Sequence, residues 1–228
     1  MLKLSLSIVI PVFNKAPYIA DLVRSIQNQK SMEWEIIFVD DGSTDSSETI
    51  CRYYAQNDPR IRYYKKDHSG IAKTRNYGNQ RAKYDLISVA DADDIWLPNR
   101  LEIIAKHFKK HPDTELFYTG IYEGSNAGTP VNYWEPKKVT AEELKKGNQG
   151  FVHGTSVYQK KVILETPYRP EMFYNDDFTL AIDFLKKGYK MRFDKEATVI
   201  YRVLPTSISR MYFKKIRRQS LKIAKGEL

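Results

Sequence analysis

The 228-residue sequence has one cysteine, no long apolar run and no low-complexity tract. Because Cys51 is alone, no disulfide can form within the chain, and a reducing compartment is favoured. No apolar segment approaches the roughly 18 residues that a membrane-spanning helix needs. Gly-x-Gly-x-x-Gly, Walker and Gly-x-Ser-x-Gly motifs are also missing, which argues against dehydrogenases, P-loop enzymes and hydrolases. These absences favour a cytoplasmic protein of another class.

The sequence is basic overall, but its charge is unevenly spread. Lys and Arg (37) outnumber Asp and Glu (28) by nine, and 42% hydrophobic and 13% aromatic residues indicate a folded globular chain. Residues 208–228 hold seven basic residues and one acidic residue, so this tail carries +6 and the other 207 residues carry only +3. Nucleic-acid binders usually place a basic stripe across the folded body. This distribution therefore argues against a nucleic-acid partner.

Apolar periodicity predicts alternating strands and helices in the first half of the chain. One helical stripe consists of Ile19, Leu22, Val23 and Ile26. We expect further helices at residues 46–57, 70–80 and 98–111, and strands at residues 4–10, 34–39, 61–64, 86–90 and 115–122. Repeated βα units favour a mostly parallel sheet, in which ligands collect beyond the carboxyl ends of the strands.

The composition changes after residue 123, where Gly, Asn, Pro and Lys become frequent. A helix is expected at residues 140–146, opened by a capping box of Thr140 and Glu143. A strand at 155–159, a helix at 176–187 and extended segments over 190–202 follow. We therefore divide the chain into a first half (1–123), a second half of the same domain (124–207) and a basic C-terminal helix (208–228).

Two acidic clusters end two separate predicted strands. Asp40 and Asp41 follow one apolar run, and the sequence Asp-Ala-Asp-Asp at 91–94 follows another. Carboxylates gathered at strand ends repel one another unless a cation lies between them, and Mg²⁺ or Mn²⁺ prefers oxygen ligands. Magnesium usually shares one or two carboxylates with substrate phosphates. A solvated turn with helix caps is the alternative interpretation of each cluster.

Four segments together resemble the inverting family 2 glycosyltransferases of the GT-A fold. The segments are 7–14 (SIVIPVFN), 39–45 (VDDGSTD), 70–78 (GIAKTRNYG) and 91–94 (DADD). They resemble that family's opening strand, nucleotide loop, connecting helix and metal motif, in the same order and spacing. The resemblance implies an α/β chain with a mostly parallel central sheet flanked by helices and a Rossmann-like N-terminal half.

The resemblance also implies roles on the donor side of the site. Phe13 would stack on the nucleobase, commonly uracil, in a pocket shaped by Pro11. Asp41 would accept a hydrogen bond from the base. Arg75 would approach the ribose or diphosphate, a role that suits its planar fork of donors. Simpler alternatives are a core position for Phe13 and an exposed helical position for Arg75.

The metal motif would hold Mn²⁺ or Mg²⁺ against the diphosphate. By resemblance, Asp91 and Asp93 would bind the cation, with Asp93 as the more direct ligand. Many relatives place a metal-binding His in a later segment that resembles residues 201–207, and the corresponding position here is Leu204. Metal binding would then depend on Asp93, the diphosphate and water.

A general base is expected at the start of the helix predicted at 176–187. Asp176 and Asp177 resemble the family's Glu-Asp pair, so Asp177 would take the proton from the acceptor hydroxyl. The alternative is an acidic first turn that stabilises the helix dipole. His153 and Asp176 lie in stretches that resemble the acceptor side, although a lone His is more often structural.

These residues predict transfer of a sugar from a nucleotide-diphosphate donor, with UDP as the expected nucleotide, to a saccharide or lipid-linked hydroxyl acceptor. The expected setting is surface polysaccharide or glycolipid synthesis. A sugar nucleotidyltransferase is the alternative enzyme, although it usually carries a Gly-rich basic loop that is missing after Pro11. A catalytically silent nucleotide-sugar-binding module is the third interpretation.

The basic tail suggests a further partner. Apolar residues alternate with its basic residues, as in helices that lie on anionic lipid: Ile208, Met211, Tyr212, Ile216, Leu221 and Ile223. This pattern predicts peripheral attachment through 208–228 to the inner face of the cell membrane. A solvated helix and a contact within a homo-oligomer are the alternatives.

Overall fold

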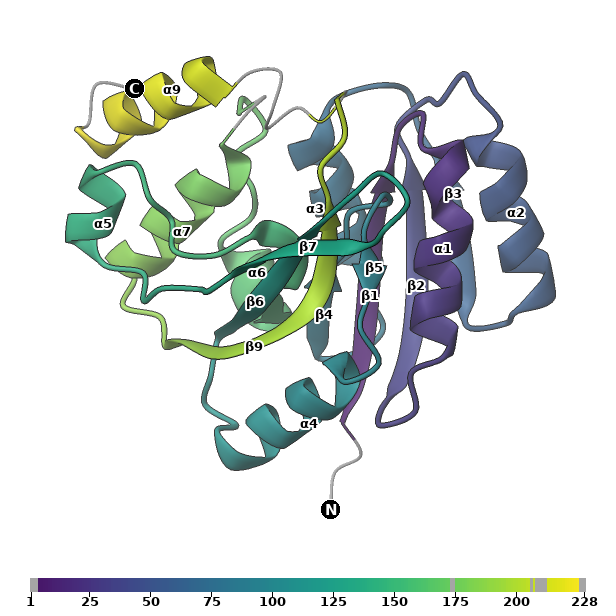
Figure 1. The fold of residues 1–228 in the computed structure, drawn as a ribbon, viewed down its shortest axis with the longest axis horizontal. Coiled ribbons are helices and arrows are strands. Elements are labelled where there is room, and N and C mark those ends of the chain that lie inside the picture. Colours follow the sequence, from purple (N-terminus) through teal and green to yellow (C-terminus); the bar gives the residue numbers. More distant parts are fainter. Residues whose placement is uncertain (1–3, 173–174, 206, 208–212, 226–228) are drawn as a thin grey trace.

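The computed structural model describes residues 4–172, 175–205, 207 and 213–225. One nine-stranded sheet runs through it in the order β3-β2-β1-β4-β8-β6-β9-β5, with β7 paired to β6 (Figure 1). The strands are β1 (Ser5–Val12), β2 (Glu33–Asp40), β3 (Ile61–Lys65), β4 (Leu86–Val89), β5 (Ile95–Trp96), β6 (Leu116–Gly124), β7 (Pro130–Trp134), β8 (Val157–Gln159) and β9 (Met191–Arg202). The helices are α1 (Ala16–Gln27), α2 (Ser47–Asn57), α3 (Ile71–Arg81), α4 (Arg100–Lys110), α5 (Ala141–Lys145), η1 (His153–Thr155), α6 (Lys160–Glu165), α7 (Asp176–Lys186) and α9 (Phe213–Ala224).

The first half is a parallel sheet covered on both faces. β1 pairs in parallel with β2 and β4, and β2 pairs in parallel with β3. Alternate β1 residues enter two separate cores: Ile8 packs among residues of α1 and α4, and Val9 packs beneath α3. A Cβ on Gly78 of α3 would lie only 2.4 Å from Val9 Cγ1, so glycine permits the close approach of this helix to β1. The predicted strands and helices of this half are confirmed.

The second half continues the same sheet and makes it mixed. β8 lies antiparallel between β4 and β6, and β9 then pairs in parallel with β6. β5, which was not predicted, follows the acidic motif and pairs with the end of β9. The strands of both halves thus form one sheet, and buried residues of β4 and α7 belong to the same core cluster. The functional division at residue 124 stays a prediction.

Helix packing follows the predicted stripes. The four residues of the α1 stripe are all fully buried: Ile19, Leu22, Val23 and Ile26. At the start of α5, the Thr140 hydroxyl accepts the backbone N–H of Glu143 at 3.2 Å, as predicted. The Glu143 carboxylate instead contacts Lys146 and Asn148, so the reciprocal bond of the capping box is replaced.

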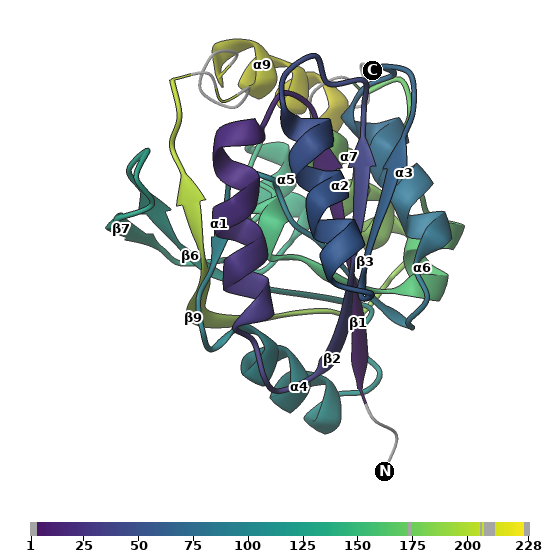
Figure 2. The ribbon, with the colours of Figure 1, turned by 90° about the vertical axis from the view of Figure 1, so that its right-hand side faces the viewer.

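The basic tail is packed on the body over its described part. Helix α9 contacts α5 and α7, and its Ser220 and Ile223 are only 3% and 7% exposed. It lies at the end of the molecule opposite α4 (Figures 1 and 2). Ile208, Arg210, Met211 and Tyr212 of the predicted interfacial helix lie outside the described residues. Within the described part of the chain, no helix combines the length and apolar character needed to cross a membrane.

Candidate active site

Two adjacent loops at the carboxyl ends of β1 and β2 form the first wall of the site. Asn14 follows β1 with a φ of 52°, in the left-handed region. Its side-chain oxygen accepts the backbone N–H of Thr44 at 2.8 Å, and its own N–H donates to Ser43 Oγ at 3.1 Å. Asp40 is fully buried and accepts the Ser43 N–H and the Tyr63 hydroxyl, both at 2.8 Å. Asp40 is therefore a structural residue that shapes the loop.

Phe13 and Asp41 lie on this wall, where the sequence predicted a nucleobase. The Phe13 side chain is 43% exposed, and its ring centroid lies 4.5 Å from that of His68. His68 Nδ1 in turn lies 2.9 Å from Asp41 Oδ2. Pro11 is half-buried on β1, two residues before Phe13. An exposed aromatic ring beside an anchored carboxylate provides a surface on which a base could stack.

The Asp41 carboxylate already has hydrogen-bond and ion-pair partners within the chain. Its carboxylate accepts the backbone N–H groups of Ser69 and Gly70, each at 3.0 Å, and pairs with Lys66. Burial raises the pKa of Asp41, but these hydrogen bonds outweigh it and lower the pKa below its ordinary value. Asp41 is ionised and fixes the loop that precedes α3. Contact with a base stays a prediction for this residue.

The Asp-Ala-Asp-Asp motif follows β4 and forms the centre of the site. Asp93 Oδ2 lies 2.6 Å from Lys15 Nζ, so an ammonium group from the segment after β1 neutralises this carboxylate. Asp94 is only 1% exposed, and its Oδ2 has no hydrogen-bond partner among the residues that the structure describes. Burial, followed by the charges of Asp91 and Asp93, raises the pKa of Asp94 well above its ordinary value. A Cβ on Gly154 would lie 2.8 Å from Asp94 Oδ2, so only glycine leaves room there.

This donor set fits a hard cation that is shared with a diphosphate. Asp91 and Asp93 offer carboxylate oxygens at one strand end, and Mg²⁺ commonly takes one or two such groups together with substrate phosphates. Among the described residues, no three His, Cys, Asp or Glu side chains are arranged to hold a metal by themselves. Leu204 is buried, with 1% exposure, and its side chain carries no donor atom. A cation here would complete its coordination with oxygens of the substrate or of water.

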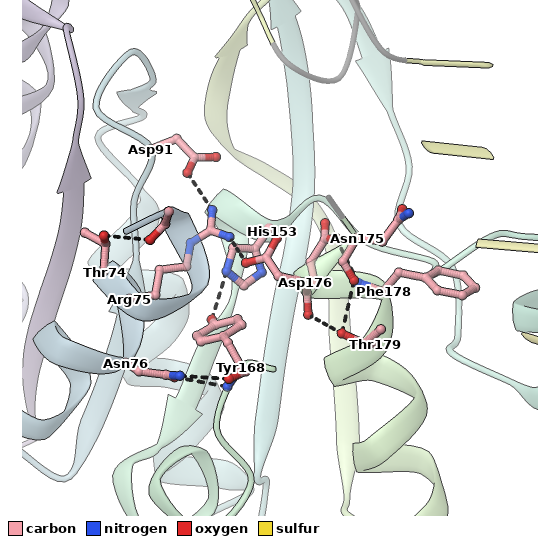
Figure 3. A network of polar contacts seen from close by, with 12 residues as sticks. Thr74, Arg75, Asn76, Asp91, His153, Tyr168, Asn175, Asp176, Phe178 and Thr179 are labelled. Atoms are coloured by element: carbon pink, nitrogen blue, oxygen red, sulfur yellow. Dashed lines mark hydrogen bonds and ion pairs between the residues drawn. The ribbon is translucent and has the colours of Figure 1, made fainter. Parts of the chain in front are cut away.

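Arg75 connects the acidic motif to the second half of the chain (Figure 3). Its Nη2 lies 3.0 Å from Asp91 Oδ1, and its Nη1 pairs with Asp176 Oδ2. The side chain is only 4% exposed, unlike the exposed helical alternative. Burial alone would lower the pKa of Arg75, but the charges of Asp176 and Asp91 raise it, so the guanidinium stays charged. Each terminal nitrogen contacts one carboxylate, and the approach of Arg75 to a ribose or diphosphate stays a prediction.

His153 lies beneath this bridge and is buried. Its Nε2 lies 2.9 Å from the Tyr168 hydroxyl, and its Nδ1 lies 3.4 Å from the Tyr158 hydroxyl. Burial, together with the nearby charge of Arg75, lowers the pKa of His153 well below its ordinary value, so the ring is neutral. Both ring nitrogens thus lie beside tyrosine hydroxyls inside the protein. This position favours the structural alternative over an acceptor contact.

Asp177 is the partly exposed carboxylate next to this bridge. Its Oδ2 accepts a hydrogen bond from Gln149 Nε2 at 2.6 Å, and its Oδ1 accepts the backbone N–H of Phe178 at 2.8 Å. Burial, then the charge of Asp176, raises the pKa of Asp177 to about 6, against the lowering effects of Gln149 and Arg75. A carboxylate with a pKa near neutrality is a stronger base than an ordinary aspartate and is still ionised at pH 7.

The backbone before Asp176 and Asp177 is held by the C-terminal helix. Asn175 has a φ of 63°, in the left-handed region. Its Oδ1 accepts the Ser220 hydroxyl at 2.8 Å, and its Nδ2 donates to the Ile216 carbonyl at 3.2 Å. Helix α9 thus contributes directly to the geometry at the start of α7. The described part of the basic tail is therefore packed against the second half of the chain.

Several residues of this site were not predicted from the sequence. Lys15 directly follows the segment 7–14, so its nearness to the site could have been inferred, but not its partner across the sheet. Gln149 and His68 lie in two loops without hydrophobic periodicity, so no sequence pattern indicated that either residue belongs to the site. Tyr168 and Asn175 also carried none.

Comparison with known proteins identifies relatives of this arrangement. A model of the family described as glycosyl transferase family 2 matches residues 7–166. TuaG of Bacillus subtilis, whose name places it in teichuronic acid biosynthesis, is 29% identical over 206 residues, which cover 89% of this chain and 81% of TuaG.

Solved structures share the fold. S. aureus TarS in complex with UDP-GlcNAc superposes with a TM-score of 0.71 at 18% identity, over 95% of this chain and 65% of that chain. The mannosyltransferase PcManGT of Pyrobaculum calidifontis, in complex with GDP-Man and Mn²⁺, has a TM-score of 0.74 at 16% identity, over 100% of this chain and 64% of that chain. The chain thus spans just under two thirds of these solved structures.

Proposed function

Because the chain belongs to glycosyltransferase family 2, we propose that it moves a sugar from a nucleotide-diphosphate donor to a hydroxyl acceptor with inversion at the anomeric carbon. UDP is the proposed nucleotide, and a saccharide or lipid-linked polymer precursor is the proposed acceptor. TarS with UDP-GlcNAc and PcManGT with GDP-Man support a nucleotide-sugar donor. TuaG supports a setting in surface polymer synthesis.

The observation that carries this proposal is the Arg75 bridge. One guanidinium holds Asp91 of the acidic motif and Asp176, the neighbour of Asp177. A donor diphosphate at the motif and an acceptor hydroxyl at Asp177 would therefore meet across a fixed distance. A fixed geometry of this kind lowers the activation barrier, because the bound reacting groups lose little further freedom on the way to the transition state.

In the proposed reaction, Asp177 accepts the proton of the acceptor hydroxyl. The hydroxyl oxygen forms a bond to the anomeric carbon as the bond from that carbon to the diphosphate oxygen breaks, and the nucleoside diphosphate departs. Gln149 holds one Asp177 oxygen at 2.6 Å and so orients the carboxylate. Asp91 and Asp93 would hold a divalent cation, which stabilises negative charge on a leaving diphosphate when it is bound.

Product analysis separates this function from its two alternatives. The protein is incubated with Mn²⁺ and a panel of nucleotide sugars, with and without saccharide acceptors, and the released nucleotide is identified. Release of nucleoside diphosphate that depends on acceptor supports the glycosyltransferase. Formation of nucleoside triphosphate and sugar 1-phosphate when pyrophosphate is added would instead indicate the nucleotidyltransferase, and binding without turnover of any donor would indicate a silent module.

Replacing Asp93 with alanine should weaken donor binding in the presence of metal. The variant loses the carboxylate that is proposed to bind the cation and that pairs with Lys15 in the structure. We therefore expect donor affinity in Mn²⁺ to fall about 10-fold or more. Calorimetric titration with UDP measures this change, with EDTA as the metal-free reference. Asp85→Ala is the matched control, because Asp85 is exposed and lies just before β4, at the other end of that strand. Equal affinity of wild type in Mn²⁺ and in EDTA would contradict the metal role.

A further inference from the structure

The outer side of α9 carries only positive charge among its ionisable groups. From 213 to 225 the sequence contains six basic residues and no acidic residue. All six are exposed, and we call them the basic face: Lys214, Lys215, Arg217, Arg218, Lys222 and Lys225. The helix has 12 residues, so the basic face extends over about 18 Å.

The inner side of α9 packs against the rest of the protein. Ile223 belongs to the core cluster formed with α5, α6 and α7. Ser220 is buried and donates to Asn175 Oδ1 at 2.8 Å, and a Cβ on Gly147 would lie 3.5 Å from Leu221 Cδ2. Ile223 and Leu221 therefore pack inward. An interfacial helix that inserts these residues into lipid, as the sequence suggested, would have to leave the body.

We propose that the basic face docks on an anionic lipid bilayer by charge alone, without insertion of α9. Each Lys or Arg near such a surface contributes attraction that adds along the face. Figure 1 shows α9 along the outer edge of the molecule, beyond α7 and α5. A row of exposed charges on one helix matches the charge of a flat anionic surface. A soluble polyanion would be gripped better by a groove with basic walls on both sides.

Docking in this way would place the membrane beside the general base. Ser220 of α9 contacts Asn175, which directly precedes Asp176 and Asp177. β1 and its parallel neighbour β4, which precedes the acidic motif, also end toward the part of the molecule where α9 lies (Figure 1). Resting on the proposed function, this placement would present an acceptor held at the bilayer to Asp177 rather than to the far end of the protein.

Vesicle sedimentation tests the docking surface without any nucleotide or acceptor. The protein is mixed at low ionic strength with vesicles of equimolar phosphatidylglycerol and phosphatidylcholine, and the bound fraction is measured. We expect binding to these vesicles, little binding to pure phosphatidylcholine, and release by high salt. The triple variant Lys214→Gln, Arg218→Gln, Lys222→Gln should bind on the order of 100-fold more weakly.

A second triple variant controls for total charge. Lys106→Gln, Lys109→Gln, Lys110→Gln removes three exposed charges from α4, at the opposite end of the molecule, and should bind nearly as wild type. Equal loss in both variants, or wild type that stays in the supernatant with anionic vesicles, would overturn the proposal. Wild type that binds inorganic polyphosphate but not these vesicles would also overturn it, in favour of a soluble polyanion. Because no step requires turnover, failure here is distinct from failure of the transferase assignment.

Discussion

Asp177→Asn is expected to reduce acceptor-dependent release of nucleoside diphosphate by about 1,000-fold, with donor affinity unchanged. The amide cannot take a proton from the acceptor hydroxyl, but it has nearly the same shape and can still contact Gln149. Asp177 lies beside the Arg75 bridge rather than in the acidic motif, so the donor side should be unaffected. Steady-state assays and calorimetric titration with UDP measure the two effects separately.

The same variant should remain folded, because the raised pKa of Asp177 means that its ionised form destabilises the wild-type protein. The pKa of Asp177 is raised from 3.8 to about 6, so between these values the folded protein binds a proton that the unfolded chain releases. The unfolding free energy therefore falls as pH rises through this window, and ionised Asp177 costs stability at neutral pH. Asparagine removes that cost but leaves one of the two donors, Gln149 Nε2 or the Phe178 N–H, without an acceptor, so its melting temperature should lie close to that of wild type. Normal turnover in a folded Asp177→Asn variant would show that another group is the base.

Arg75→Met should be the most destabilising single change in the site, with a loss of about 3 kcal/mol in the free energy of unfolding. Removing one partner of a buried ion pair leaves the other charge unpaired, at a typical cost of about 3–5 kcal/mol. Here Asp176 and Asp91 both lose their partner. The lower end of the range is expected because the Asp91 side chain is 25% exposed. Urea denaturation followed by circular dichroism measures the change.

Two further variants show whether the bridge is the cause. Lys73→Met removes a charge from an exposed position of the same helix and should change stability by no more than about 0.5 kcal/mol. Arg75→Lys keeps the charge but lacks the planar fork that reaches two carboxylates, so an intermediate loss is expected. An Arg75→Met variant as stable as Lys73→Met would show that the bridge contributes little.

The fold and the acidic side of the site were predictable because they depend on local pattern. A buried strand followed by carboxylates needs only apolar periodicity to be recognised, and parallel neighbours place their carboxyl ends at one edge. Asp41 and Asp93 were located in this way. The antiparallel insertion of β8 between β4 and β6 was not predictable, because strand order depends on contacts between distant segments.

Side-chain contacts between distant parts of the chain could not be predicted from sequence patterns. Arg75 has the spacing of an ordinary helical residue, and only the fold shows that Asp176, 101 positions later, pairs with it. The run of charge in the +6 tail carries no information about the inner side of its helix. Ser220 and Ile223 of α9 contact the second half of the chain.

The pH dependence of kcat/KM for the acceptor tests the central claim that Asp177 is the base of a glycosyltransferase. This ratio reports the ionisation of groups in the free enzyme. Asp177 acts only when ionised, and its pKa is about 6, so kcat/KM should rise with pH and level off above that value. The rising limb should be missing from the residual activity of Asp177→Asn. A wild-type profile that is flat through this range, or the same rising limb in the variant, would contradict the account.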